Sequence, residues 1–198
     1  KYIQDHVLDA GFRTGLSASK HTSSDNLNLK ELDEYAKTKN PQVIDLILDK
    51  ACFADMLACA KNSGDPYPVQ VVTVQIDLTN AMMCLRLLRM GGGEQGKMLL
   101  EQALLDGGLL DQQALLRAYG DGQSSVLYLL NRTPYEKLGR LIAESDGTAQ
   151  VAERLADDFR MELIRNAKHT IFGASVLTAY FYAQEYAVKN IRIVVAAK

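Results

Sequence analysis

Apolar residues recur at helical spacing along most of the chain. Asn40 followed by Pro41 is typical of a helix start, and the apolar pattern behind it runs to a break at 62–64. Residues 69–76 are rich in β-branched side chains, which favour a strand. The apolar pattern nevertheless continues to residue 88 with no turn residue before Gly91, and about twenty residues exceed a typical strand. The segment therefore predicts a buried helix.

Further helices are predicted downstream. Residues 94–105 and 111–119 form two short apolar-periodic segments, separated by a Gly-Gly turn. The tetrapeptide Thr133-Pro134-Tyr135-Glu136 resembles a capping box and opens another helix. Long amphipathic stretches then run from about 148 to 167 and from 176 onward. No segment shows strand alternation framed by hairpin turns, so the pattern predicts an all-α fold.

The chain also contains an internal repeat. Asn80 and Asn190 each lie within a long apolar helix, 110 positions apart, and an amphipathic helix precedes each. A capping box at 28–31 marks the start of the first unit. We therefore predict a remnant of a preceding repeat or a linker at 1–27, one helical unit at 28–132, and a second at 133–198 that is truncated at its C-terminal end.

Composition narrows the possible functions. The chain of 198 residues has a net charge of −2, with Lys and Arg scattered among acids, which argues against nucleic-acid binding. The three cysteines, Cys52, Cys59 and Cys84, are too few for a disulfide scaffold and lack partner ligands for a metal, so we expect buried thiols. No uninterrupted apolar stretch approaches the ~18 residues of a membrane span. The absence of an initiator Met predicts a fragment of a longer protein.

One segment resembles a nucleotide-binding loop. Residues 91–97 satisfy the spacing G-x-x-x-x-G-K. Met98 occupies the position of the Mg²⁺-binding hydroxyl, Glu94 adds a carboxylate near the expected phosphates, and a helix is predicted where the motif needs a strand. We interpret the segment as a loop between helices and expect no cofactor.

Acidic residues offer candidates for chemistry, but the surroundings favour structural roles. The pairs Asp45/Asp49 and Asp157/Asp158 are typical of a solvated helix face. Asp77 and Glu185 instead lie within strongly apolar helices. An unpaired buried carboxylate is costly, so each should find a partner or reach the surface. We hypothesise pairing with Arg86, Arg192 or a helix N-terminus, and expect no catalytic residue and no metal ligand.

The chain ends in Tyr180-Phe-Tyr-Ala-Gln-Glu-Tyr-Ala-Val-Lys-Asn-Ile-Arg-Ile-Val-Val-Ala-Ala-Lys198, preceded by Phe172-Gly173. Upstream, Asp77-x-x-Asn80 is followed by Leu85-Arg86 and by the Gly-Gly turn at 107–108. This combination resembles the C/d subunits of V-type (A/V-type) rotary ATPases, over residues 32–198. The sequence departs from that pattern at Ala174 and Ser175, where Pro and Glu are expected, and at Ala187, which replaces an acid.

The resemblance implies repeated helical bundles arranged as a funnel, with about two of three units present here. It implies a non-catalytic adapter whose partners are the central-stalk subunits and the proteolipid rotor ring. Such a subunit is cytoplasmic and peripheral to the membrane, and transport of H⁺ or Na⁺ is left open. The possible contact residues are Asp77, Asn80, Arg86, Arg89, Glu185, Asn190 and Arg192. Two alternatives remain: a general helical scaffold or protein-interaction domain, and a nucleotide-binding protein using the degenerate loop at 91–97.

Overall fold

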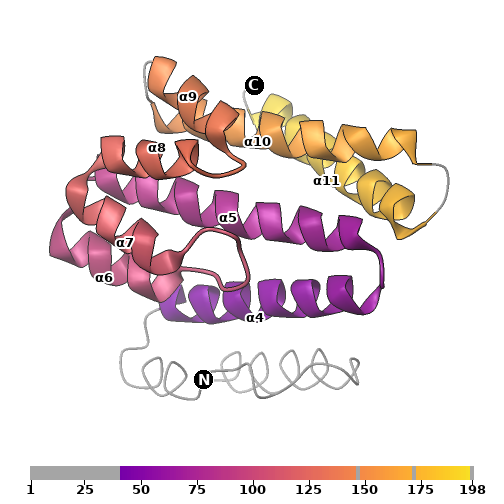
Figure 1. The fold of residues 1–198 in the computed structure, drawn as a ribbon, viewed down its shortest axis with the longest axis horizontal. Helices are drawn as coiled ribbons and strands as arrows, with labels where there is room; N and C mark the ends of the chain where they lie inside the picture. The colour runs from indigo at the N-terminus through magenta and orange to yellow at the C-terminus, as the bar shows by residue number, and fades with distance from the viewer. Residues whose placement is uncertain (1–40, 146–147, 171–172, 197–198) are drawn as a thin grey trace. The chain divides into compact units, whose positions relative to one another are not determined.

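The computed structural model describes residues 41–145, 148–170 and 173–196, and every regular element in these ranges is helical (Figure 1). The helices are α4 (Pro41–Asn62), α5 (Pro66–Arg89), α6 (Gly93–Ala103), α7 (Gln112–Asp121), α8 (Gln123–Asn131), α9 (Glu136–Glu144), α10 (Ala149–Asn166), η3 (Ala167–His169, a 3₁₀ turn) and α11 (Ala174–Ala196). The predicted all-α fold is confirmed for this part of the chain. The helix start expected at 28–31 lies outside the described residues.

The chain divides into two units, Lys1–Asp55 and Met56–Lys198, with the division inside α4. The first unit is described only for its α4 residues. The second contains the end of α4 and all the helices from α5 to α11. The repeat boundaries expected at 28 and 133 concern sequence similarity rather than compactness, and they stay a prediction.

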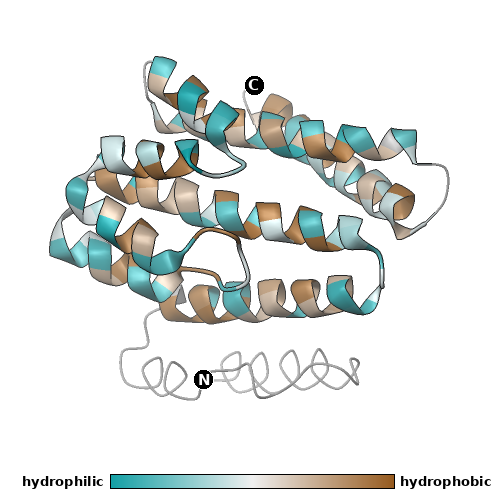
Figure 2. Ribbon diagram, in the orientation of Figure 1, coloured by the Kyte–Doolittle hydropathy of each residue, from teal (hydrophilic) through white to brown (hydrophobic). Residues whose placement is uncertain are grey.

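Helix α5 is the central element of the second unit, where it packs against α6, α7, α8, α10 and α11. Its start is fixed by the Asp65 carboxylate, which accepts a hydrogen bond from the Tyr67 amide at 2.9 Å, and by Pro66 at the first helical position. Hydrophobic residues recur along the helix, as the hydropathy colouring of the ribbon shows (Figure 2). Because neighbouring helices cover several of its faces, burial outweighs the strand preference of its β-branched residues.

Among the described helices, α5 alone is long and apolar enough to cross a membrane by length and composition. Two thirds of the relevant stretch (67%) is buried inside the protein, as in the core helix of a folded unit. The sequence pattern had suggested no such stretch, because Asp77 and Asn80 interrupt it.

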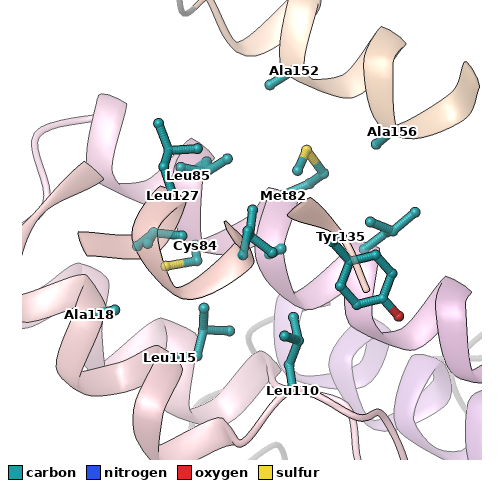
Figure 3. Close-up of a cluster of buried hydrophobic side chains, with 14 of the residues drawn as sticks. Met82, Cys84, Leu85, Leu110, Leu115, Ala118, Leu127, Tyr135, Ala152 and Ala156 are labelled. Carbon is teal, nitrogen blue, oxygen red and sulfur yellow. The ribbon is translucent and has the colours of Figure 1, made fainter. Parts of the chain in front are cut away.

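The main core lies where α5 meets α6 to α10 (Figure 3). On α10 the fully buried positions of this core are Ala152 and Ala156, and Leu155, Phe159 and Leu163 pack against it from partly buried positions. Small residues let two helix backbones approach closely, so α10 lies directly against α5. The largest fully buried apolar side chains of the core are Leu78, Leu85, Leu100, Leu115, Leu130, Tyr135, Leu138 and Ile142.

A second, smaller apolar cluster holds the N-terminal part of α11 against α5 and α10. It contains Ala179 and Tyr182 of α11, and the Tyr182 hydroxyl lies 3.2 Å from Gln75 Oε1 on α5. The carboxylate of Asp65, which caps α5, also accepts a hydrogen bond from the Ser175 amide at 3.1 Å. One carboxylate therefore accepts a hydrogen bond from a backbone amide in the first turn of each of these two long helices.

The expectation of three buried thiols is wrong for two of them: Cys52 and Cys59 are exposed, and only Cys84 is buried. The two exposed cysteines do share one face of α4, as their spacing of seven predicts. On α4 the residues with the least exposure are Ile47, Leu57 and Ala60, and their positions leave the cysteine face outside. Composition alone does not indicate which side of an apolar helix is covered.

We expect Cys84 to resist thiol reagents in the native protein. Burial raises the pKa of its thiol to about 12, so little reactive thiolate exists at mildly alkaline pH, and the side chain has no exposed surface. Peptide mapping after a short maleimide pulse should find Cys59 labelled and Cys84 unlabelled until denaturant is added. Equal labelling of both in the native protein would contradict the packing described here.

Candidate functional site

The Asp77 side chain is completely buried, yet it is fully supplied with hydrogen-bond donors. Its Oδ1 accepts from the Leu110 amide at 2.9 Å, and its Oδ2 accepts from the Leu109 amide at 3.0 Å and from the Tyr135 hydroxyl at 2.5 Å. Three donors replace the water that a carboxylate loses on burial. Asp77 is therefore held by hydrogen bonds rather than by a cation.

These contacts correct part of the pairing hypothesis. Within the described residues Asp77 has no arginine partner, because Arg86 pairs with Glu153 instead. The two backbone donors immediately precede Asp111, the N-cap of α7. The expected helix N-terminus is thus close to what the structure shows, since Asp77 binds the turn that leads into α7.

Asn80 lies one turn further along α5 and holds the same connection. Its Nδ2 donates to the Leu105 carbonyl and its Oδ1 accepts from the Leu105 amide, both at 2.9 Å. The amide side chain therefore pairs with the Leu105 backbone as a neighbouring strand would. We call Asp77, Asn80 and Tyr135 the α5 clamp, because together they fix the connection between α6 and α7.

The clamp explains the Gly-Gly turn at 107–108. A Cβ atom at Gly108 would lie 2.0 Å from Asp77 Oδ1 and 3.2 Å from Ile76 Cγ2. Gly107 has φ of +95°, a conformation that side chains with a Cβ rarely adopt. The first glycine is needed for its backbone conformation and the second for its lack of a side chain.

Tyr135 joins the clamp from the loop before α9. Burial raises the pKa of its phenol far above the usual value, and the hydrogen bond to Asp77 raises it further. The phenol therefore remains protonated and acts as a donor. The capping box predicted at 133–136 is corrected here: α9 begins at Glu136, and Thr133 instead forms a turn in which its Oγ1 accepts from the Tyr135 amide at 3.3 Å.

Replacing Asn80 with alanine should lower the free energy of unfolding by about 2–3 kcal/mol, because both Leu105 backbone groups lose a partner in a buried place. Urea denaturation followed by far-UV circular dichroism measures the change. Thr79→Ala, at the neighbouring partly exposed position of α5, is the matched control and should change stability little. Equal effects of the two substitutions would show that the Asn80 amide does not hold the connection.

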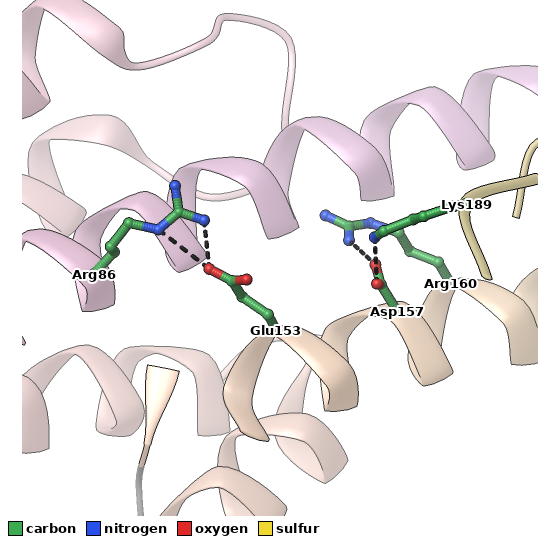
Figure 4. A network of polar contacts seen from close by, with 5 residues as sticks. All are labelled: Arg86, Glu153, Asp157, Arg160 and Lys189. Atoms are coloured by element: carbon green, nitrogen blue, oxygen red, sulfur yellow. Dashed lines mark hydrogen bonds and ion pairs between the residues drawn. The ribbon is translucent and has the colours of Figure 1, made fainter. Parts of the chain in front are cut away.

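Arg86 belongs to a polar network that links α5, α10 and α11 (Figure 4). Arg86 Nε donates to Glu153 Oε1 of α10 at 3.1 Å, with a second contact through Nη2. Asp157 of α10 accepts from Arg160 at 2.9 Å and from Lys189 of α11 at 2.5 Å. Several of these side chains are about half exposed, so each pair contributes only about 0–1 kcal/mol. The network orients the three helices more than it stabilises them.

Arg89 differs from Arg86. Both terminal nitrogens of its guanidinium are shielded from solvent, and neither has a hydrogen-bond partner among the described residues. A buried guanidinium without an acceptor is costly. Among the predicted contact residues that the structure describes, Arg89 is therefore the one whose buried side-chain nitrogens lack a hydrogen-bond acceptor.

The predicted contact residues on α11 lie apart from the clamp. Glu185, Asn190 and Arg192 are all exposed. Glu185 has thus reached the surface, one of the two outcomes expected for it. Asn190 is exposed where Asn80 is buried, so among the described residues the predicted second unit shows no equivalent of the α5 clamp.

The segment at 91–97 is a helix-to-helix turn. Gly91, Gly92 and Gly93 all have positive φ, and α6 begins at Gly93, so Gly96 and Lys97 lie inside a helix. The element before it is α5, where a phosphate-binding loop requires a strand. The Tyr119 hydroxyl packs where a Cβ at Gly96 would lie, at 2.2 Å, which explains that glycine structurally. The described residues also contain no cluster of three potential metal ligands.

Two features were missed by sequence reasoning. The role of Tyr135 had no local signal, because its partner Asp77 is 58 residues away. The exposure of many apolar residues of α11 was also not anticipated from the sequence. A partial signal existed for α11: its apolar residues lie on several faces, so contacts along a single stripe cannot cover them all.

Comparison with known proteins agrees with this architecture. Residues 12–198 match the ATP synthase (C/AC39) subunit family. A curated relative, the C subunit of the V-type sodium ATPase of Enterococcus hirae, is 25% identical over 174 residues, which cover 86% of this chain and 52% of the relative. The chain thus spans about half the length of that relative, and no solved structure matches it significantly. Because the family match extends over nearly the whole sequence, the chain belongs to the ATP synthase (C/AC39) subunit family.

Proposed function

We propose that this chain is part of a non-catalytic adapter that joins the rotating central stalk of a V-type ATPase or ATP synthase to its membrane proteolipid ring. The observation that carries the proposal is the family match over residues 12–198. The proposed partners are the stalk subunits and the ring, and the proposed location is the cytoplasmic face of the membrane. The ion moved, H⁺ or Na⁺, would be determined by other subunits.

The close packing of the helices supports this role. An element that transmits torque must not yield internally, and closely packed helices transmit strain well. The α5 clamp ties α5 to the connection before α7 and to the start of α9, with four hydrogen bonds of 2.9–3.0 Å and one of 2.5 Å. We infer that the clamp keeps the bundle rigid under load rather than contacting a partner itself.

The proposed contact residues therefore fall into two groups. Asp77 and Asn80 are fully engaged inside the bundle, so we assign them structural roles. Glu185, Asn190 and Arg192 are exposed on α11 and are available to neighbouring subunits. Arg89 is a further candidate, but because both terminal nitrogens of its guanidinium are shielded from solvent, its side chain must change conformation before an acceptor of a neighbour can reach it.

Co-purification tests the proposal. A tagged copy of the full-length protein should be expressed in the organism that naturally makes it. Affinity purification from membranes solubilised with a mild detergent should then retrieve both stalk and ring subunits. Cells that lack the protein should hydrolyse ATP without pumping ions. Retrieval of unrelated proteins without ATPase subunits would favour a general scaffold, and saturable ATP binding by the chain would favour a nucleotide-binding protein.

A further inference from the structure

A pocket of about 580 Å³ lies beside the α5 clamp, between the N-terminal half of α5 and the C-terminal half of α10. Its remaining walls include Leu109 of the α6–α7 connection and Pro134 and Tyr135 of the loop before α9. Pockets that hold small organic ligands measure roughly 300–1,000 Å³. The cavity is therefore large enough for such a ligand, and its lining residues all lie between Pro66 and Asn166.

The clamp holds two of these walls in place. The Leu109 amide donates to Asp77, which fixes the backbone that carries the exposed Leu109 side chain. The Tyr135 ring is buried and lies edge-on to Phe159 of α10, with ring centroids 5.6 Å apart. A ligand would therefore meet a preformed pocket with an aromatic corner, and a preformed site loses little binding free energy to the ordering of its walls.

The lining also indicates the chemistry of the ligand. Its charged residues are Lys137 and Glu162, and these pair with each other at 2.8 Å. A charged ligand would lose its hydration without gaining an unpaired partner. Aromatic rings, in contrast, pack favourably against rings such as those of Tyr135 and Phe159. We propose that the pocket binds a neutral, apolar small molecule that contains a ring.

Such a ligand would touch α10 and the α6–α7 connection together, and would thus add a link between two parts of the bundle. A ligand that binds only the folded chain also raises its stability by mass action. This proposal does not rest on the proposed function, because it concerns the interior of the bundle and can be tested on the purified full chain.

Two fluorescent probes that share one ring system test the charge preference. N-phenyl-1-naphthylamine is neutral, and 8-anilinonaphthalene-1-sulfonate is the same molecule with an added sulfonate. We expect the neutral probe to bind saturably, with fluorescence enhancement as the measurement, and the anionic probe to bind about tenfold more weakly. Tighter binding of the anionic probe would overturn the proposal of a neutral ligand.

The ion pair at the rim gives a sharper version of this test. Glu162→Gln leaves Lys137 without its partner. The preference for the neutral probe over the anionic probe should then fall about fivefold, because an unpaired cation now faces the sulfonate. An unchanged preference would show that the probes bind away from this pocket, against the proposal.

A substitution that fills the pocket locates the site. Val69→Trp adds a large side chain to the α5 wall and should weaken binding of the neutral probe at least about tenfold, because it occupies the space of the ligand. Val69→Phe is the smaller alternative if circular dichroism shows that the tryptophan variant does not fold. Leu141→Trp makes the same change on α9, outside the pocket, and should leave the affinity unchanged.

The exposed apolar residues of α11 could also attract an apolar probe, so Ile191→Asp is a second control and should leave the affinity unchanged. No saturable binding, binding that survives the filled pocket, or binding that is lost with Ile191→Asp would each overturn the proposal. Failure to co-purify stalk or ring subunits would instead contradict the proposed function and would leave the pocket proposal intact.

Discussion

Replacing Asp77 with alanine is expected to lower the free energy of unfolding by about 4 kcal/mol, one of the two largest effects in the chain. The substitution leaves the Leu109 and Leu110 amides and the Tyr135 hydroxyl without an acceptor at a place that water does not reach. It also opens a cavity beside Gly108, which approaches the carboxylate closely. Urea denaturation monitored by far-UV circular dichroism provides the measurement.

Two further variants show whether the loss arises from the hydrogen bonds. Asp77→Asn keeps the shape but presents an NH₂ group to a donor, so it should cost less than alanine, about 2 kcal/mol. Glu101→Ala, which removes an exposed carboxylate from α6, should cost almost nothing. If Asp77→Ala were no more damaging than Glu101→Ala, the buried carboxylate would not be holding the α6–α7 connection.

Gly108→Ala should be the second severe substitution, lowering the free energy of unfolding by about 3 kcal/mol. The new methyl group would lie 2.0 Å from Asp77 Oδ1, so either the carboxylate or the turn must move, and both amide hydrogen bonds weaken. Equilibrium unfolding in urea again gives the value.

A glycine in open space provides the matched control. Gly120 lies within α7 and a Cβ there would meet nothing within 4 Å, so Gly120→Ala should stabilise the chain by up to about 1 kcal/mol through helix propensity. Combining Gly108→Ala with Asp77→Ala tests the mechanism directly. Because the clash partner is gone, the second substitution should add much less than it does alone. If the losses in unfolding free energy of the two single variants simply add in the double variant, the destabilisation by Gly108→Ala arises from another contact in the turn.

Local patterns predicted most helices well. Pro41 begins α4 as expected, Thr148 caps α10 by accepting from the Val151 amide at 3.3 Å, and the apolar stretch at 69–88 lies within α5. These signals are reliable because capping and periodicity involve residues a few positions apart. Helix α8 was not predicted. Its nine residues are too short for a strong periodic signal, and packing against α5, α7 and α9 stabilises it.

The sequence predicted which polar residues of the candidate site are unusual, but not which groups they contact. Asp77 and Asn80 were singled out correctly as unusual polar residues in an apolar helix. Of the partners expected for Asp77, neither arginine contacts it among the described residues, whereas a helix N-terminus is close to what the structure shows. The true partners are two backbone amides and a tyrosine, 32 to 58 residues away. Backbone amides have no side-chain signature, so no sequence pattern could identify them.

The sequence by itself therefore determined that this protein is helical, where most helices begin, and which family its C-terminal motif and its Asp77-x-x-Asn80 helix resemble. Only the tertiary structure decided which polar groups meet, which cysteines lie outside, and which face of α11 remains open. The physical reason is the distance along the sequence between the residues whose contacts decide each feature. Helix formation depends on contacts within one or two turns, whereas burial and pairing depend on how distant segments pack. A helix such as α11, with apolar residues on several faces, does not indicate which face will be covered.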